Sequence, residues 1–264
     1  MRADATPRYG NGTRMAGQTL LVGLAHPDDE VGAAGTILAQ RARGDRVVVV
    51  WLTRGEMTEA FGAIPTDEVA RIREEHGRVA GEILGVETRF LDLPDTGVAA
   101  DPATARRVAA VIADVRPDAV LTWGDAWGRG MRHPDHQASG KVFRDAITLA
   151  RIAKVVAPAV PHRHPAPVFT YRGAHSTLPV VAVDVEPHVD TILALADFYR
   201  ERIGFGDRAW VQERLRAQGA PFGLRYAEVW DAWETQPGVV PALLPAPLDF
   251  GEHTHPDREE EIPL

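Results

Sequence analysis

Short apolar runs alternate with longer amphipathic stretches over the first 150 residues of the chain. The runs are rich in branched residues and nearly free of polar positions, which is typical of strands buried on both faces of a parallel sheet. They predict strands over residues 19–25, 46–53, 88–93 and 118–123. The stretches between them predict helices over residues 30–44, 66–85, 101–117 and 136–150. This alternation predicts an α/β fold with a doubly wound, mostly parallel sheet.

The alternation of short apolar runs and amphipathic stretches ends in the second half of the chain. The later elements are a Pro- and His-rich loop, two candidate strands and a helical stretch, over residues 157–168, 168–172, 180–185 and 187–218. No polar linker separates them from the first half, so we expect a single domain over 18–250 with a C-terminal strand and helix elaboration. We expect residues 1–17 to form a flexible arm and the acidic residues 251–264 to form a solvated tail.

Composition narrows the function classes. The chain has 264 residues, 45% of them hydrophobic, and a formal net charge of −8, which argues against a nucleic-acid or anionic-membrane partner. It has no cysteine, so any metal must be held by His, Asp and Glu side chains. Residues 1–17 lack a signal-peptide core, and no run approaches the roughly 18 apolar residues of a membrane span. We therefore expect a cytoplasmic protein of enzyme size, with its oligomeric state open.

Two clusters of histidine and carboxylate residues follow predicted strands. "HPDDE" begins at His26, directly after the first strand, and "HPDH" begins at His133, after the fourth. The carboxyl ends of parallel strands meet at one edge of a sheet, so we expect the clusters to converge there. His26 with Asp29, three positions on, and a histidine of the second cluster would supply three metal ligands. Three protein ligands and a water make the open site of catalytic zinc.

A structural interpretation competes with the metal site. Acidic residues at a helix start often only cap it, and for either cluster alone this interpretation is the more common one. Capping does not require histidines in both places, which favours the metal. Six further histidines are assigned to surface or loop positions. They are His76 and His188 in helical stretches, His162 and His164 in the Pro-rich loop, and His253 and His255 in the tail.

Successive motifs of the chain resemble the LmbE-like, or PIG-L, zinc-dependent N-acetylglucosamine deacetylases. The motifs are "AHPDDE", "LTRGE", "IREEHGRVAGEILGV", "FLDLPDTG" and "RPDAVLTWGDAWGRGMRHPDHQ". The resemblance covers about residues 19–150 and weakens afterwards, where "PFGLRYAEVW" is similar to a late family segment. It implies a Rossmann-like fold, zinc, and hydrolysis of the N-acyl group of an amino sugar to an amine and an acid.

The resemblance also assigns roles to residues at the two clusters. His26, Asp29 and His136 would hold one Zn²⁺, or another divalent ion, per chain. Asp28 would be the general base that acts on water, and His133 would stabilise the tetrahedral intermediate or give a proton to the leaving amine.

Further assignments concern the surroundings of these residues. Arg73 and Asp95 would lie near the sugar hydroxyls, although taken alone each is typical of a surface ion pair. Glu30 and Asp135 would support the ligands or cap helices, and the assignments of Arg54 and Glu56 are weaker still. Some sugar-inositol deacetylases of the family have a tyrosine where this chain has Met131, and a thioether donates no hydrogen bond.

The substrate is therefore expected to be a small-molecule N-acetylglucosaminyl conjugate whose aglycone the sequence does not reveal. A dinucleotide-dependent oxidoreductase would need a G-x-G-x-x-G turn where the chain has "AHPDDEVG", whose carboxylates would repel a pyrophosphate. A metal-dependent phosphoesterase using the same residues and a non-catalytic sugar-binding protein stay open as alternatives.

Overall fold

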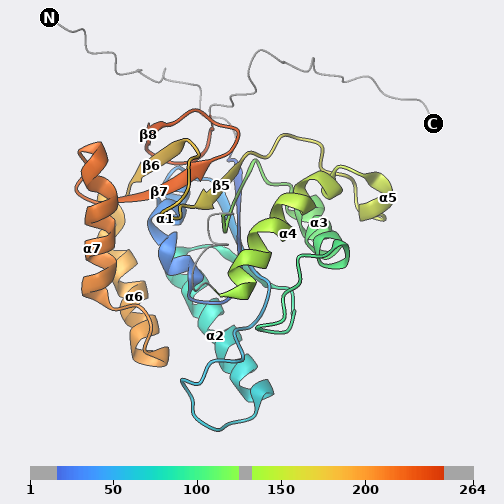
Figure 1. Cartoon of the computed structure of the whole chain (residues 1–264), viewed down its shortest axis with the longest axis horizontal. Helices are drawn as coiled ribbons and strands as arrows, with labels where there is room; N and C mark the ends of the chain where they lie inside the picture. The colour runs from blue at the N-terminus through green and yellow to red at the C-terminus, as the bar shows by residue number, and fades with distance from the viewer. Residues whose placement is uncertain (1–16, 125–132, 247–264) are drawn as a thin grey trace, which may run out of the picture.

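A computed structural model describes residues 17–124 and 133–246 of the chain. Within them, eight strands form one sheet in the order β3-β2-β1-β4-β5-β7-β6-β8 (Figure 1). The strands are β1 (Thr19–Leu24), β2 (Arg46–Trp51), β3 (Glu87–Phe90), β4 (Ala119–Thr122), β5 (Val168–Tyr171), β6 (Val180–Asp184), β7 (Ala227–Ala232) and β8 (Gly238–Val240). The α-helices are α1 (Ala34–Ala42), α2 (Thr66–Leu84), α3 (Pro102–Val115), α4 (Pro134–Ala150), α5 (Ala153–Val156), α6 (Val189–Ile203) and α7 (Arg208–Gly219). Short 3₁₀ turns are η1 (Asp29–Gly32), η3 (Glu186–His188) and η4 (Ala220–Phe222).

The first five strands confirm the doubly wound, mostly parallel sheet. Strands β3, β2, β1, β4 and β5 are all parallel, and Val22 of β1 lies opposite Val49 of β2 and Leu121 of β4. Alternate residues of β1, β2 and β4 enter two separate hydrophobic clusters, one shared with α1 and α6 and the other with α3 and α4. Figure 1 shows these helix pairs on opposite sides of the sheet. Burial of both faces explains the unbroken apolar runs in the sequence.

The far end of the sheet departs from the predicted pattern. Strand β7 inserts between β5 and β6 and is antiparallel to both, while β8 is parallel to β6. All six residues of β7 are buried, yet it carries two carboxylates. Glu228 accepts hydrogen bonds from the backbone N–H groups of Gly35 and Thr36, at 2.9 and 2.7 Å, at the start of α1. Asp231 pairs with Arg172. These buried charges interrupt the apolar pattern, so the sequence analysis missed this strand.

Several helix boundaries also differ from the prediction. The helix expected over 30–44 is divided into η1 and α1, with a non-helical Ala33 between them. Helix α4 begins at Pro134, two residues before its predicted start, because proline suits the first helical position and His133 caps it. The His133 ring accepts a hydrogen bond from the backbone N–H of Asp135 at 3.3 Å.

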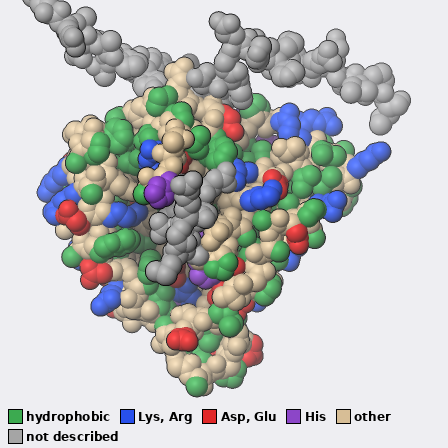
Figure 2. All heavy atoms as spheres, viewed as in Figure 1, with side chains coloured by type: hydrophobic (Ala, Val, Ile, Leu, Met, Phe, Trp, Pro, Cys, Tyr) green, Lys and Arg blue, Asp and Glu red, His purple; other side chains and the backbone are tan. Residues whose placement is uncertain are grey.

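Some predictions concern parts of the chain outside the described residues. These are most of the N-terminal arm, the tail with His253 and His255, and Met131. Among the helices that the structure describes, none is long and apolar enough to cross a membrane. The cytoplasmic location and the domain limits stay predictions. On the face shown in Figure 2, the described Lys and Arg side chains are interspersed with Asp and Glu side chains.

Candidate active site

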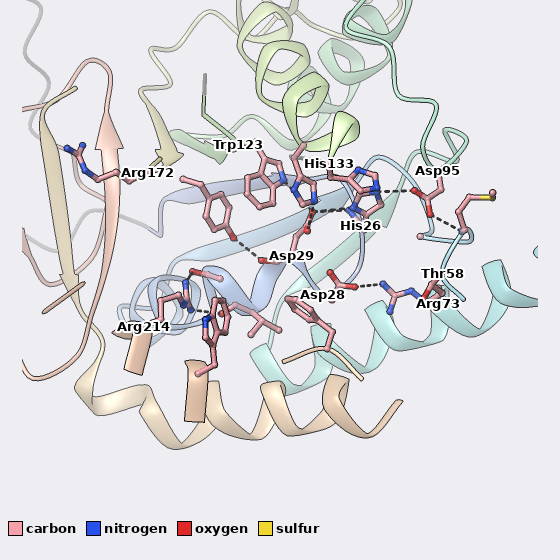
Figure 3. A pocket seen from close by; sticks show the side chains of 18 of the residues that line it. His26, Asp28, Asp29, Thr58, Arg73, Asp95, Trp123, His133, Arg172 and Arg214 are labelled. Atoms are coloured by element: carbon pink, nitrogen blue, oxygen red, sulfur yellow. Dashed lines mark hydrogen bonds and ion pairs between the residues drawn. The ribbon is translucent and has the colours of Figure 1, made fainter. Parts of the chain in front are cut away.

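The two clusters converge at the carboxyl edge of the parallel strands, as predicted (Figure 3). The first cluster turns sharply out of β1 into η1, with Asp28 at a φ of 109°. The second is carried by α4, which lies directly against the end of β4. A Cβ atom built on Gly140 would stand 2.3 Å from the carbonyl oxygen of Trp123, so only glycine permits this approach. Close packing of α4 on the sheet edge thus fixes where its first turn, with His133 and His136, meets β1.

The predicted ligands His26, Asp29 and His136 are brought together. The His136 Nε2 and Asp29 Oδ1 atoms are 3.1 Å apart, and His26 Nδ1 and Asp29 Oδ2 are 3.9 Å apart. One ligating atom each of His26, His133 and His136 lies within 4.8 Å of the others, and a second such group joins His26 and His133 to Asp95 and Asp135. Imidazole and carboxylate donors at this spacing fit a divalent ion such as zinc.

Two carboxylates hold the far side of the His26 ring. Its Nε2 atom lies 3.1 Å from Asp95 Oδ1 and 3.2 Å from Asp135 Oδ2. Burial alone would lower the pKa of His26, but these contacts and the charge of Asp29 outweigh burial and raise it to about 10. With Nε2 donating to carboxylates, Nδ1 is the atom that faces Asp29 and is available to bind a metal. Such a carboxylate–histidine arrangement is the usual support of a metal-binding histidine.

Asp135 is a supporting residue, as predicted. Its side chain is fully buried, and it accepts hydrogen bonds from the backbone N–H groups of Thr96 and Val98, at 2.8 and 3.1 Å. It thereby joins the loop after β3 to α4 and to the His26 ring.

Asp29 is locked in its position by donors. Its Oδ2 atom accepts hydrogen bonds from the backbone N–H groups of Ala25 and His26, both at 3.0 Å, and from the Trp123 indole at 3.3 Å. Burial would raise the pKa of Asp29, but the nearby His136 and His26 lower it below the usual range of a carboxyl group. The Trp123 indole also stacks on the His136 ring, with centroids 3.9 Å apart and planes inclined by 9°.

Asp28 turns away from Asp29 and pairs with Arg73 (Figure 3). The Asp28 Oδ2 and Arg73 Nη2 atoms are 2.6 Å apart. Arg73 is only 2% exposed, so its interpretation as a surface residue is wrong. Burial raises the pKa of Asp28 to about 6, although the charge of Arg73 opposes the shift. A carboxyl group that titrates near neutrality is suited to accept a proton and to release it again.

Glu30 stabilises the turn at Asp28 through hydrogen bonds to its carboxylate. Its carboxylate is fully buried and accepts hydrogen bonds from the Tyr199 hydroxyl at 2.6 Å, the Trp51 indole at 3.2 Å and the backbone N–H of Asp28 at 2.9 Å. Burial raises the pKa of Glu30 to about 7. Tyr199 lies on α6, and no motif in the sequence pointed to it.

The side chains of His26, Asp29, His133 and His136 are called the metal cluster below. Asp95 lies closer to them than the resemblance implied. One carboxylate oxygen contacts His26, and the other accepts a hydrogen bond from the backbone N–H of Met57 at 2.9 Å. Glu56 accepts a hydrogen bond from the backbone N–H of Asp95 at 2.8 Å. Arg54 instead pairs with Glu74 and Asp92, both at 2.9 Å. Asp95 is therefore placed to orient His26, and Arg54 is bound to carboxylates of its own.

Four other histidines that the structure describes, His76, His162, His164 and His188, stand apart from the cluster. His76 is buried, at 7% exposed, against the rings of Phe61, Phe198 and Tyr199, so its prediction as a surface residue is wrong. Burial lowers the pKa of His76 to about 4. His162 is also buried and lies 2.8 Å from the carbonyl oxygen of Pro117 through its Nε2 atom, whereas His164 is exposed and His188 half-buried.

The cluster opens into a cavity of about 630 Å³. Beyond the predicted residues, its walls include five side chains that the sequence analysis did not single out: Tyr171, Arg172, Phe205, Trp210 and Arg214. The Tyr171 hydroxyl donates a hydrogen bond to the carbonyl oxygen of Asp29 at 2.9 Å. A cavity of this size accommodates a drug-sized molecule.

Fold and site together define an α/β protein with a candidate divalent-metal site at the carboxyl edge of its parallel strands. Comparison with known sequences gives the family. Residues 21–147 match the sequence profile of the family PIG-L: GlcNAc-PI de-N-acetylase. This match confirms the resemblance of residues 21–147 to the PIG-L, or LmbE-like, family.

Similar proteins with curated names include two deacetylases. A diacetylchitobiose deacetylase of Thermococcus kodakarensis is 33% identical over 153 residues, which cover 55% of this chain and 57% of that protein. A 1D-myo-inositol 2-acetamido-2-deoxy-alpha-D-glucopyranoside deacetylase of Kineococcus radiotolerans is 33% identical over 159 residues, covering 48% of this chain and 44% of that protein. The chain thus spans about half the length of these curated relatives.

A solved structure extends the likeness to most of the fold. The conserved protein TT1542 from Thermus thermophilus superposes with a TM-score of 0.69 at 28% identity, over 82% of this chain and 94% of that one. The shared architecture therefore extends beyond the family match at 21–147 into the later elements.

Proposed function

We propose that the protein is a zinc-dependent hydrolase that removes the N-acetyl group of a small N-acetylglucosaminyl conjugate. The observation that carries the proposal is the division inside the first cluster. Asp29 faces His26 and His136, whereas its neighbour Asp28 faces Arg73 and stays free of the ligand cluster. One carboxylate can bind a metal while the other accepts a proton. The names of the relatives support the amide bond and the amino sugar.

Three residues would hold the ion: His26 through Nδ1, Asp29 through its carboxylate and His136 through Nε2. Zinc held there would supply Lewis acidity toward water and the amide carbonyl. The buried carboxylates around His26 favour a cation at this place, because they concentrate negative charge in a region of low polarity.

Asp28 would take the proton of the attacking water. Its pKa of about 6 leaves it ionised at neutral pH yet basic enough to be a useful proton acceptor. The Arg73 guanidinium fixes the carboxylate on the side away from Asp29.

His133 would act on the oxygen and nitrogen of the breaking amide. Burial and the charges of His26 and His136 lower its pKa, so the ring is neutral near pH 7. Its Nδ1 atom accepts from the backbone N–H of Asp135, which assigns the proton to Nε2. That N–H can donate to the developing oxyanion. To pass a proton to the leaving amine instead, the ring would first have to take up a second proton, such as the one that Asp28 accepts from water.

The experiment compares bond types in one preparation. Zinc-loaded protein is incubated with methyl N-acetylglucosaminide and, separately, with an aryl phosphate ester, and acetate, primary amine and phosphate are quantified. We expect acetate and amine in equal amounts and no phosphate. Release of phosphate would favour the phosphoesterase alternative, and binding of the sugar with no product would favour the non-catalytic one.

A further inference from the structure

Exposed apolar side chains gather at the mouth of the candidate active site. Among the described residues, the large hydrophobic side chains that stand exposed are Met57, Ile152, Val160, Phe205, Trp210 and Val239. Three of these six, Met57, Phe205 and Trp210, line the same cavity as the metal cluster, at 55%, 45% and 57% exposed. Apolar surface left in water costs about 25 cal/mol per Å², so its concentration at one cavity marks a binding surface.

The turn between α6 and α7 displays Phe205. It is flanked by Gly204 and Gly206, whose φ angles are 73° and 90°. A Cβ atom on Gly206 would stand 2.8 Å from the carbonyl oxygen of Ala196, so a larger residue fits neither the space nor the backbone angle. The backbone of this turn therefore holds Phe205 at the cavity instead of in the core.

Arg214 connects α7, which carries Trp210, to η1, the turn that contains Asp29. It lies one helical turn after Trp210 on α7, and its guanidinium carbon is 5.8 Å from the centroid of the Trp210 ring. Its terminal nitrogens donate to the carbonyl oxygens of Gly32 and Val31, at 3.3 and 3.4 Å. Both carbonyls belong to η1, which also contains Asp29. The position of the Trp210 ring is thus set relative to the metal cluster.

The cavity has two ends. In Figure 3, Arg73, Thr58 and Asp95 lie on one side of Asp29, and Arg214 and Arg172 lie on the other. The end with Arg73 and Asp95, where the backbone of Met57 donates to Asp95, is the one that the family resemblance assigns to the sugar. We call the opposite wall, formed by Phe205, Trp210 and Arg214, the aromatic arm. It comes from elements that follow the family match at 21–147.

We propose, building on the proposed deacetylase function, that the aromatic arm binds an apolar group that the substrate carries outside its sugar ring. The group is an aryl or alkyl substituent, which packs against Trp210 and Phe205 while the amide lies at the metal cluster. Two sources supply this chemistry: the aglycone on the sugar, or an acyl chain longer than acetyl. A cavity of about 630 Å³ has room for the sugar and such a substituent together.

The test uses three probes with the zinc-loaded protein. The reference is methyl N-acetylglucosaminide; the others are phenyl N-acetylglucosaminide and the methyl glycoside with an N-hexanoyl group. The kcat/KM of amide hydrolysis and the calorimetric Kd are measured for each. We expect at least one apolar probe to be preferred over the reference by about tenfold or more. Trp210→Ala should abolish most of that preference, and Trp210→Phe should retain it.

Val160→Ala is the control, because Val160 is an exposed hydrophobic residue, 69% exposed, that does not line the cavity. Its preference among the probes should equal that of the unmodified protein. A preference for the phenyl glycoside identifies the aglycone as the occupant, and one for the hexanoyl amide identifies the acyl chain. Equal kcat/KM and Kd for all three probes, unchanged by Trp210→Ala, would overturn the aromatic arm. If no probe is hydrolysed, the deacetylase proposal fails. The Kd values of the three probes then show by themselves whether the aromatic arm binds an apolar group.

Discussion

The adjacent residues Asp28 and Asp29 have different interaction partners. Single substitutions can therefore distinguish proton acceptance from metal binding. Asp29 accepts hydrogen bonds from backbone groups and contacts His136, whereas Asp28 contacts Arg73. Asp28→Asn should keep its metal and lose about 10²-fold or more in kcat, since a positioned base is removed. Asp29→Asn should lose metal, because an amide oxygen is a weaker ligand than a carboxylate. Elemental analysis and turnover, measured on the same samples, check both.

The two variants also differ in how they respond to added zinc. Excess metal should partly restore Asp29→Asn and should leave Asp28→Asn unchanged. The opposite pattern, with metal lost from Asp28→Asn and kept by Asp29→Asn, would exchange the two roles.

Arg73 sets the pH range in which Asp28 can act as a base. Asp28 must be ionised, so activity should fall as the pH drops through its pKa of about 6. Removing the Arg73 charge takes away an interaction that lowers this pKa, which should rise further. Arg73→Gln should therefore move the acid limb of kcat/KM to higher pH, by about one unit. The pH profile of kcat/KM measures the shift.

Arg71→Gln is the matched control for this profile. Arg71 lies on the same helix, is exposed and pairs only weakly with Asp67, at 3.8 Å. An acid limb that stays in place in Arg73→Gln, or moves equally in both variants, would show that Arg73 does not act through Asp28.

At the scale of elements, α4 carries two histidines to the site only because it can approach β4. Gly140→Ala would place a methyl group against the backbone of Trp123, so the helix must shift. We expect a loss of about 1–3 kcal/mol in the free energy of unfolding, as for other overpacked positions, together with weaker metal binding. Urea unfolding and metal titration measure the two effects. Lys141→Ala, at an exposed position of the same helix, should change neither.

The sequence predicts the first half of the fold well, because its strands are buried on both faces and its site follows two of them. Continuous apolar runs, separated by helical stretches, predicted β1, β2 and β4. The two clusters follow the carboxyl ends of β1 and β4. Strand β7 escaped because Glu228 is charged yet buried as an acceptor for the start of α1. His76 was misjudged for a related reason. Whether a polar side chain on a helix is buried depends on which elements cover it, and a single sequence does not show that.

The candidate site, too, could be predicted from the sequence only in part. Spacing and strand ends indicated His26, Asp29 and one histidine of the second cluster as ligands, and the family resemblance chose His136. Trp123, Tyr171 and Trp210 could not be predicted as site residues, because aromatic residues at such positions are equally typical of a core. Their contribution follows from the packing of the end of β4, of β5 and of α7 against the first cluster and η1.

At the scale of the whole molecule, the metal should contribute to stability. The carboxylates of Asp29, Asp95 and Asp135 are buried around His26, and an ion bound there stabilises only the folded chain. Zinc at a hundredfold excess over its Kd would add about 2.7 kcal/mol, or roughly 5–10 °C in Tm for a chain of this size. Thermal melting of the apo protein with and without zinc measures it. An unchanged Tm would contradict a metal site at this cluster.

The stacking of Trp123 on His136 gives the protein a built-in optical reporter. The indole ring lies 3.9 Å from an imidazole that we propose binds the ion, and its N–H points to the carboxylate of Asp29. Any change of charge or orientation at His136 alters the electrostatic environment of the excited indole. Arrival of the ion can therefore be followed by intrinsic tryptophan emission, without a label and without turnover, and Trp123→Phe should silence the signal.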